Sequence, residues 1–137
     1  MSNKVSIEAE IKKDIKDVWN IYNSPEHIVH WNFASPDWHC PKSEVDLRVG
    51  GKFSSRMEAK DGSFGFDFEA IYDEVLQYKK IEYTMPDGRK VEITFESNGS
   101  STKLVTLFDP ETVHPPEVQK EGWQSILNNF KTYAESK

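Results

Sequence analysis

Residues 52–72 read KFSSRMEAKDGSFGFDFEAIY, and this stretch is the most direct indication of the fold in the chain. Apolar and polar residues alternate over residues 53–59 and again over residues 64–72, which is typical of strands with one buried face. Asp61-Gly62 lies between the two runs, and an Asp-Gly pair in this position is a strong signal for a tight hairpin. The stretch therefore predicts two neighbouring antiparallel strands.

The alternation extends in both directions along the chain. Consecutive runs are separated by the turn signals Gly50-Gly51, Pro86-Asp87-Gly88 and Asn98-Gly99, which predict antiparallel neighbours. Residues 32–41 contain two prolines and show no period, so they predict a loop. Further strands are expected at residues 5–12, 43–48, 78–85, 91–95 and 104–108.

Three helices are predicted, two short and one long. Asp14 can cap the first, which carries one apolar face. Ser24 and Pro25 suit the cap and the first position of the second, where the missing N–H of proline costs nothing. After Pro115-Pro116 the apolar residues recur at helical spacing to about the last residue. The apolar stripe of this long helix is expected to contain Val118, Gly122, Ile126 and Phe130, widened by Trp123, Leu127 and Tyr133.

The predicted order of elements is one strand, two short helices, six strands and one long helix. This order predicts an α+β fold in which a curved antiparallel sheet wraps around the long C-terminal helix. The length is that of one domain, so residues 1–137 are expected to form a single domain.

Side-chain directions in the second strand of the hairpin follow from the same alternation. Phe64, Phe66 and Phe68 should face the C-terminal helix, whereas Asp67 and Glu69 should face water. A shift of one residue would reverse every one of these directions. Two carboxylates on one strand can act as a general acid and base only where one of them is desolvated, so no catalytic pair is predicted here.

Composition and charge restrict the function. The net charge is −6 and the Lys and Arg residues are scattered, so nucleic acid is not an expected partner. Cys40 is the only cysteine, which excludes an internal disulfide. Residues 1–5 lack the apolar segment of a signal peptide, and no window is as apolar as a membrane span. A cytoplasmic location without membrane insertion is therefore expected.

The chain is rich in aromatic residues, with four Trp, five Tyr and eight Phe. Aromatic residues at strand and helix spacing commonly form the core, and a filled core is one explanation. The other is a cavity, because a sheet curved around a helix leaves space that bulky side chains line. In that case the expected ligand-binding residues are Trp31, Trp38, Phe53, Met57, Phe66, Phe68, Tyr83, Trp123, Ile126 and Phe130.

Metal-binding and nucleophilic candidates are few. His27 and His30 are three apart on a predicted helix, but a structural zinc site needs four ligands, so no metal and no cofactor are expected. Cys40 would be a nucleophile only if a base lowered its pKa. His39 is adjacent to it, but adjacent residues usually point apart, so Cys40 is expected to be a small apolar filler. The sequence contains no nucleophile elbow, phosphate-binding loop or His-Glu-x-x-His motif, and no catalytic residue is assigned.

Five strings of residues occur in a characteristic order. They are Val18-Trp19, SPEHIVHW at 24–31, Cys40-Pro41, EVDLRVGGKF at 44–53 and EGWQSIL at 121–127. Together, and over nearly the whole chain, they resemble the START-like (helix-grip) superfamily, and within it the family named after the activator of heat-shock protein 90 ATPase. The resemblance implies a helix-grip fold with an internal apolar pocket, as in small bacterial proteins, and it brings no catalytic motif.

Three functions are compatible with these observations. The first is a binding protein that encloses a small apolar or amphipathic molecule and performs no chemistry. The second is an enzyme similar to polyketide cyclases and aromatases, which a buried ionisable group in the cavity would favour. The third is an interaction protein of the co-chaperone type with a protein partner, which a large exposed apolar patch would favour.

Gly122 lies inside the predicted long helix, where glycine costs about 1 kcal/mol relative to alanine. One explanation is that the position is tolerant. The other, which the resemblance at Glu121-Gly122-Trp123 favours, is that the sheet near Phe53 or Met57 leaves no room for a Cβ. Gly122 would then close one end of the cavity.

Overall fold

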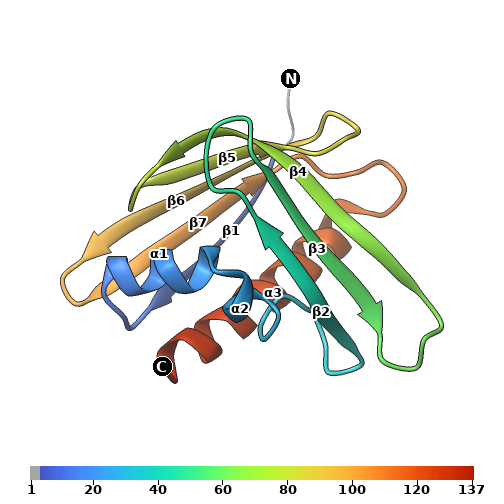
Figure 1. Ribbon diagram of the computed structural model, residues 1–137, viewed down its shortest axis with the longest axis horizontal. Coiled ribbons are helices and arrows are strands. Elements are labelled where there is room, and N and C mark those ends of the chain that lie inside the picture. Colours follow the sequence, from blue (N-terminus) through green and yellow to red (C-terminus); the bar gives the residue numbers. More distant parts are fainter. Residues whose placement is uncertain (1–3) are drawn as a thin grey trace.

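Seven strands form one antiparallel sheet that curves around the helices (Figure 1). The computed structural model describes residues 4–137, and residues 1–3, part of the segment in which the sequence predicts no signal peptide, lie outside the described residues. The strands are β1 Val5–Ile11, β2 Trp38–Val45, β3 Lys52–Ala59, β4 Gly65–Leu76, β5 Lys80–Thr84, β6 Lys90–Asn98 and β7 Ser101–Phe108. Their order in the sheet is β1-β7-β6-β5-β4-β3-β2, so six consecutive strands form the predicted meander and β1 joins its far end.

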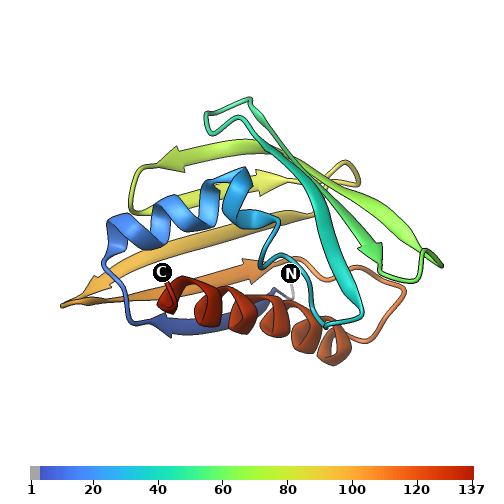
Figure 2. The ribbon, with the colours of Figure 1, turned by 60° about the horizontal axis from the view of Figure 1, so that its bottom comes forward.

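Three helices lie within the curve of the sheet, as Figure 2 shows. They are α1 Ile15–Asn23, α2 Pro25–Ile28 and α3 Pro116–Glu135. α3 lies along β1, α1 packs over β6 and β7, and α2 packs against β2. This arrangement confirms the α+β helix-grip fold, with a curved antiparallel sheet around a long C-terminal helix and two short helices after the first strand.

The caps of the short helices differ in detail from the prediction. Asp14 and Ser24 occupy the N-cap positions of α1 and α2, but neither side chain accepts a hydrogen bond from its helix. The hydroxyl of Ser24 instead donates to the carbonyl oxygen of Asn20 at 2.6 Å. Pro25 is the first residue of α2, as predicted.

β3 and β4 pair in the register that the hairpin signal predicts. Met57 lies opposite Phe66, and directly opposite residues of an antiparallel pair share a face. On the other face, the carboxylate of Asp67 lies 3.5 Å from the guanidinium of Arg56. Glu69 shares that face and pairs with a lysine of β3 at 2.9 Å. The outward directions of Asp67 and Glu69 are therefore confirmed.

The three phenylalanines of the hairpin do not all face α3. Phe68 contacts Trp123 of α3, with the ring centroids 6.3 Å apart. Phe64 is 62% exposed and packs on Trp38. The prediction is wrong for Phe64 because β4 begins only at Gly65, so that Phe64 belongs to the turn and not to the pleated strand.

β2 begins earlier than the sequence pattern indicates. Residues 38–41 were expected in a loop, but Trp38 already pairs with Ala59 of β3. The register shifts between His39 and Lys42, which is the mark of a β-bulge. The bulge interrupts the period of two, and Pro41 is tolerated because β2 is an edge strand. The loop prediction is therefore wrong for these residues.

β5 is shorter than the predicted strand of residues 78–85. It covers Lys80–Thr84. Tyr78 has a φ of 64°, in the left-handed region, and the N–H of Lys79 donates to the carbonyl oxygen of Leu76 at 2.9 Å. Tyr78 therefore belongs to the β4–β5 turn.

The buried stripe of α3 is rotated relative to the predicted one. Leu127, Phe130 and Ala134 are buried, whereas Val118 is 54% exposed. A spacing of four residues advances about 400° around a helix, so a stripe drawn with that spacing drifts by about 40° at each step. The alternation of spacings of four and three from Trp123 to Ala134 corrects this drift, and Val118 falls outside the stripe.

Gly122 is not a point of close approach. A Cβ built on Gly122 would have no atom within 4 Å outside its own neighbourhood in the helix. The expectation that the sheet leaves no room for a side chain, and that Gly122 closes the cavity, is therefore wrong. A side chain at position 122 would point into open space. The resemblance of Glu121-Gly122-Trp123 to the family therefore does not indicate a close contact between the helix and the sheet.

One cluster of buried side chains fills the space between the sheet and the helices. It includes Ile11 of β1, Val18 of α1, Leu104 and Phe108 of β7, and Phe130 of α3, all fully buried. Within residues 4–137, no helix combines the length and the apolar character that crossing a membrane requires.

Candidate functional site

A cavity of about 190 Å³ lies between the concave face of the sheet and α3. Its walls come from the three helices, from the residues after α2 and from every strand except β2. Most of the wall is hydrocarbon. The lining residues are Ile7, Tyr22, Asn23, Ile28, Trp31, Asn32, Phe53, Met57, Phe66, Phe68, Tyr72, Ile81, Tyr83, Ile93, Thr106, Trp123, Ile126 and Leu127.

Most of the side chains that the sequence selects for a cavity meet around it. The lining contains Trp31, Phe53, Met57, Phe66, Phe68, Tyr83, Trp123 and Ile126. Phe66 is also 43% exposed, so the cavity approaches the surface near the start of β4.

The structure places two of the selected residues outside the lining. Trp38 lies on the edge strand β2, where its ring packs on Phe64 and Phe66. Phe130 is fully buried and packs edge-to-face on Trp31 and Tyr22, with ring centroids 4.9 Å and 5.1 Å away. Phe130 is therefore part of the core behind the cavity wall.

Sequence reasoning missed five aliphatic residues of the lining, Ile7, Ile28, Ile81, Ile93 and Leu127, and most of its polar part. Tyr22 and Tyr72 both line the cavity, together with Asn23, Asn32 and Thr106. For Tyr72 a signal exists, because it continues the same strand face as Phe68. For Tyr22, the signal is its place on the apolar side of α1. Neither sequence pattern predicts whether the hydroxyl group of the tyrosine borders a cavity or is surrounded by packed side chains.

Burial keeps the tyrosines of the cavity protonated. The pKa of Tyr22 is raised because the phenol is buried. The pKa of Tyr72 is raised first by burial and then by the neighbouring Tyr22. The pKa of Tyr83 is raised well above its usual value by burial, and further by Tyr22 and Tyr72. The three phenols thus lie close enough to influence one another, and all are neutral at physiological pH.

Among the described residues, those that line the cavity include no Asp, Glu, His, Lys or Arg. General acid–base catalysis depends on a group whose pKa lies near the operating pH, and the tyrosines are shifted away from it. The lining can therefore hold an apolar molecule and offer it hydrogen bonds, but its described residues present no base for proton abstraction.

Cys40 and His39 do not form a nucleophile and base. Cys40 is buried, and burial raises the pKa of its thiol, whereas a nucleophilic thiol needs a lowered one. The Nε2 atom of His39 lies 3.6 Å from the carboxylate of Glu58. The expectation that Cys40 is a small buried filler is confirmed.

The two histidines of the first helical region lie against Tyr133 of α3. The Nδ1 atom of His27 is 2.7 Å from the hydroxyl of Tyr133, and the ring of His30 stacks on the same tyrosine at 5.8 Å. Among residues 4–137, no three His, Cys, Asp or Glu side chains gather as they would around a metal ion.

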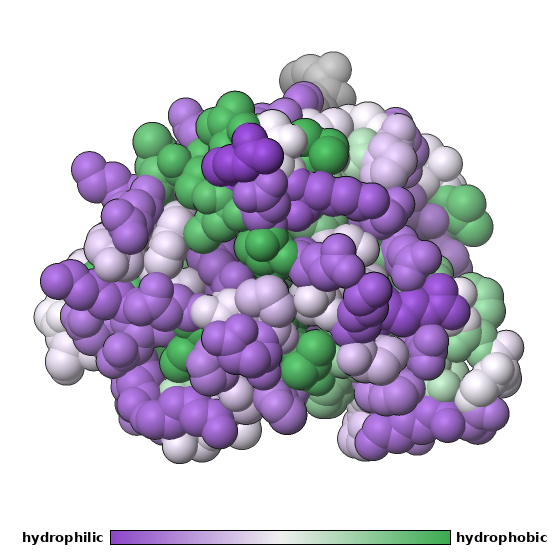
Figure 3. Space-filling model, in the orientation of Figure 1, coloured by the Kyte–Doolittle hydropathy of each residue, from purple (hydrophilic) through white to green (hydrophobic). Residues whose placement is uncertain are grey.

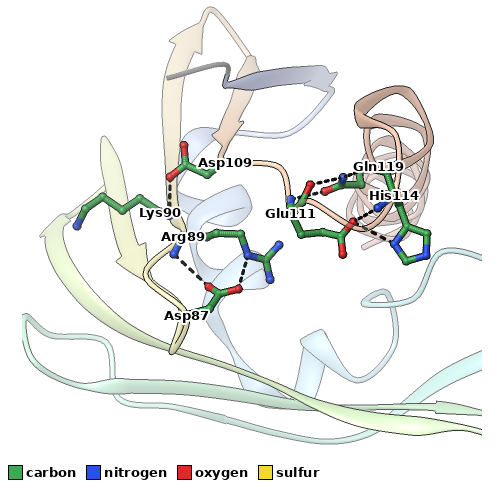
Figure 4. Close-up of polar contacts among 7 residues, drawn as sticks. All are labelled: Asp87, Arg89, Lys90, Asp109, Glu111, His114 and Gln119. Atoms are coloured by element: carbon green, nitrogen blue, oxygen red, sulfur yellow. Dashed lines mark hydrogen bonds and ion pairs between the residues drawn. The ribbon is translucent and has the colours of Figure 1, made fainter. Parts of the chain in front are cut away.

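Polar contacts fix the segment that leads from β7 into α3 (Figure 4). The side chain of Gln119 accepts a hydrogen bond from the N–H of Glu111 at 2.8 Å and donates to the carbonyl oxygens of Glu111 and His114. The N–H of His114 donates to the Glu111 carboxylate at 2.6 Å, and this bond is the main reason for the lowered pKa of Glu111. Arg89 extends from the β5–β6 turn toward Glu111. This segment therefore holds α3, one turn before Trp123, in a fixed position.

Exposed apolar side chains are spread over the surface. Val49, Ile71 and Leu76 are exposed on the β2–β3 loop and β4. Figure 3 shows hydrophobic residues gathered over this region, with polar residues around them.

The chain was compared with models of protein families, with curated proteins and with solved structures. A family model described as Activator of Hsp90 ATPase homolog 1-like protein matches residues 12–135. A search of the curated proteins finds no match.

Solved structures with similar folds come from several bacteria. The solution structure of an AHSA1-like protein from Aeromonas hydrophila is 47% identical, with a TM-score of 0.91 over 97% of this chain and 92% of that chain. A protein from Cytophaga hutchinsonii is 48% identical, with a TM-score of 0.85 over 98% of this chain and 93% of that chain. A protein from Chromobacterium violaceum, at 22% identity and a TM-score of 0.86 over 97% of this chain and 98% of that chain, shares the fold.

Proposed function

We propose that this chain, which belongs to the Activator of Hsp90 ATPase homolog 1-like protein family, binds a small apolar or amphipathic molecule between its sheet and α3. The cavity of about 190 Å³ carries the proposal. A void of this size reduces stability because its lining lacks contact partners, and a ligand of matching shape would supply them. The site of action is the cytoplasm, and the partner is a small molecule, not a nucleic acid.

The residues assigned to ligand binding are those of the predicted set that border the cavity. They are Trp31, Phe53, Met57, Phe66, Phe68, Tyr83, Trp123 and Ile126. Trp38 and Phe130 are left out because they pack elsewhere.

Binding without chemistry is favoured over a cyclase-like or aromatase-like reaction. Such a reaction requires a group that moves a proton at neutral pH, and the described residues of the lining offer only neutral phenols, amides, a hydroxyl and two indoles as polar groups. The cavity is therefore assigned to holding and enclosing its ligand, and no cofactor takes part.

Two substitutions on α3 test the proposal. Ile126→Trp should fill the cavity, because Ile126 is part of its wall. Val118→Trp places the same bulk on an exposed position of the same helix and is the control. Small aromatic hydrocarbons such as toluene should raise the melting temperature and change the tryptophan fluorescence of the wild type and of Val118→Trp, because Trp31 and Trp123 border the cavity.

Ile126→Trp should lose both responses while keeping its fold. Native mass spectrometry of the purified wild type should in addition detect a retained small molecule that Ile126→Trp lacks. If saturating probes change neither the melting temperature nor the fluorescence of the wild type, the cavity does not bind such molecules and the proposal fails.

A further inference from the structure

Three tyrosines face the cavity from two sides. Tyr72 of β4 and Tyr83 of β5 lie directly opposite each other in the sheet, with their rings edge-to-face and centroids 6.2 Å apart. Tyr22 comes from α1, on the helical side of the same cavity. Its neighbours are Trp31, at a ring distance of 5.1 Å, and Phe130. Strand register and helix placement thus bring three phenols to one apolar space.

Among the described residues, the hydroxyls of these tyrosines have no protein partner. Tyr72 is 3% exposed and Tyr83 is 7% exposed, and within residues 4–137 no hydrogen bond is found for either hydroxyl or for that of Tyr22. Their oxygen atoms are not among the fully buried unpaired atoms, so they open onto the cavity that the three residues line. Tyr133, outside the cavity, shows the usual arrangement, with its hydroxyl 2.7 Å from His27. Placing a hydroxyl in apolar surroundings without a hydrogen bond costs free energy, so buried hydroxyls normally have partners.

Trp31 carries an unpaired group of a different kind. The Nε1 atom of Trp31 is fully buried and is without a hydrogen-bond partner among the described residues. Because this atom is fully buried, it does not open onto the cavity that the Trp31 ring lines, and it is not one of the donors that a ligand there would meet.

The charge of the acceptor follows from the rest of the lining. Within residues 4–137, the lining includes no Lys, Arg or His, so a carboxylate or phosphate would be buried without a cation. Burying an unpaired ionised group is far more costly than burying a neutral one. The phenols remain protonated, as their raised pKa values indicate, so they can donate to a neutral oxygen.

We infer that the ligand carries an uncharged oxygen acceptor, such as a ketone or ester carbonyl, whose two lone pairs accept hydrogen bonds from two of the hydroxyls of Tyr22, Tyr72 and Tyr83. The apolar body of the ligand packs against Phe53, Phe68 and Ile126. This inference rests on the proposed function, since it describes the occupant of the same cavity.

The size of the cavity limits the body of the ligand. An apolar cavity of about 150 Å³ in another protein holds a benzene molecule. At about 190 Å³, this cavity suits a molecule with one ring and a short substituent.

Three probes of nearly equal size test the inference on the unmodified protein. Acetophenone carries a carbonyl, ethylbenzene has a methylene group in its place, and benzoate carries a negative charge. Dissociation constants from calorimetry should show acetophenone binding about tenfold more tightly than ethylbenzene, because it alone satisfies the unpaired donors. Benzoate should bind more weakly than both.

Phenylalanine substitutions locate the donors. Tyr72→Phe combined with Tyr83→Phe should reduce the ratio of the acetophenone affinity to the ethylbenzene affinity at least threefold, because only acetophenone loses hydrogen bonds. Tyr78→Phe, which removes a hydroxyl from the β4–β5 turn outside the cavity, is the control and should keep the preference. Equal affinity for acetophenone and ethylbenzene, or tightest binding of benzoate, would overturn the inference and leave the proposed function standing. If none of the three binds, both fail.

Discussion

Trp123 of α3 and Phe108 of β7 stack face to face, with their ring centroids 4.0 Å apart and their planes 9° apart. Residues 109–115 connect β7 to α3, and the two stacked residues lie on either side of this connection. The stack therefore joins the last strand to the last helix. Trp123 also borders the cavity and contacts Phe68 of β4. One side chain thus links the two halves of the sheet through the helix that they enclose.

Trp123→Ala should therefore be among the more destabilising single substitutions in α3. The loss should be about 2 kcal/mol or more, because both the stack and the cavity wall disappear. Urea unfolding measures this change. Trp38→Ala is the matched control, since Trp38 packs on the exposed Phe64 at the sheet edge and should cost clearly less. Equal losses would mean that the stack contributes nothing particular.

Gly122→Ala should stabilise the protein by up to about 1 kcal/mol. The position lies inside α3, and a Cβ there meets no atom within 4 Å, so only the gain in helix propensity remains. Gly51→Ala is the contrasting substitution, because a Cβ at Gly51 would collide with the backbone oxygen of Asp46. Thermal unfolding should show a higher melting temperature for the first and a lower one for the second. A decrease for Gly122→Ala would mean that the helix backbone is more closely covered than the structure indicates.

Gln119→Ala should loosen the segment between β7 and α3. It removes three hydrogen bonds to the backbone of Glu111 and His114 and should cost about 1 kcal/mol or more. Hydrogen exchange at the amide of Glu111 should accelerate. Lys120→Ala, at the next and exposed position, is the control and should leave this exchange unchanged. Unaltered protection in Gln119→Ala would show that the segment is held by other contacts.

Stability should fall at alkaline pH because of the cavity tyrosines. Burial raises the pKa values of Tyr22, Tyr72 and Tyr83, so the folded state holds these protons more tightly than the unfolded chain, whose tyrosines titrate near pH 10. Their contribution is fully present below about pH 10 and is lost as the pH rises beyond it.

Melting temperatures measured between about pH 8 and 11.5 check this prediction. The wild type should lose stability above about pH 10, and Tyr72→Phe with Tyr83→Phe should show a shallower decline. Phe68→Leu removes a cavity ring without a hydroxyl and should keep the slope of the wild type. Identical slopes in all three proteins would contradict the assignment of buried, neutral phenols.

The strands of this fold were predictable because most of them have one buried face. Residues 53–59 and 64–72 show a clear period of two, and their register in the sheet is the one expected. The alternation failed where the backbone departs from a regular strand. Between His39 and Lys42 the bulge breaks the period, and at Phe64 the strand has not yet begun.

The cavity was predictable in position but not in chemistry. The large side chains at Phe53, Phe68 and Trp123 mark its wall because they are large and periodic. The tyrosine hydroxyls could not be recognised, because their surroundings depend on how the helices are placed over the concave face of the sheet. The same reason explains why the prediction of a close approach at Gly122 was wrong. The distance between a helix and the neighbouring elements cannot be predicted from the residues of that helix alone.

The bulge and the proline of β2 have a consequence for the behaviour of the protein in concentrated solution. β2 ends the sheet, so its outer backbone groups are open to pairing with another chain. Pro41 offers no N–H there, the bulge twists the strand, and Lys42 and Glu44 present charged side chains that are 73% and 67% exposed. Features of this kind discourage edge-to-edge association, so β2 is protected against growth into intermolecular sheets.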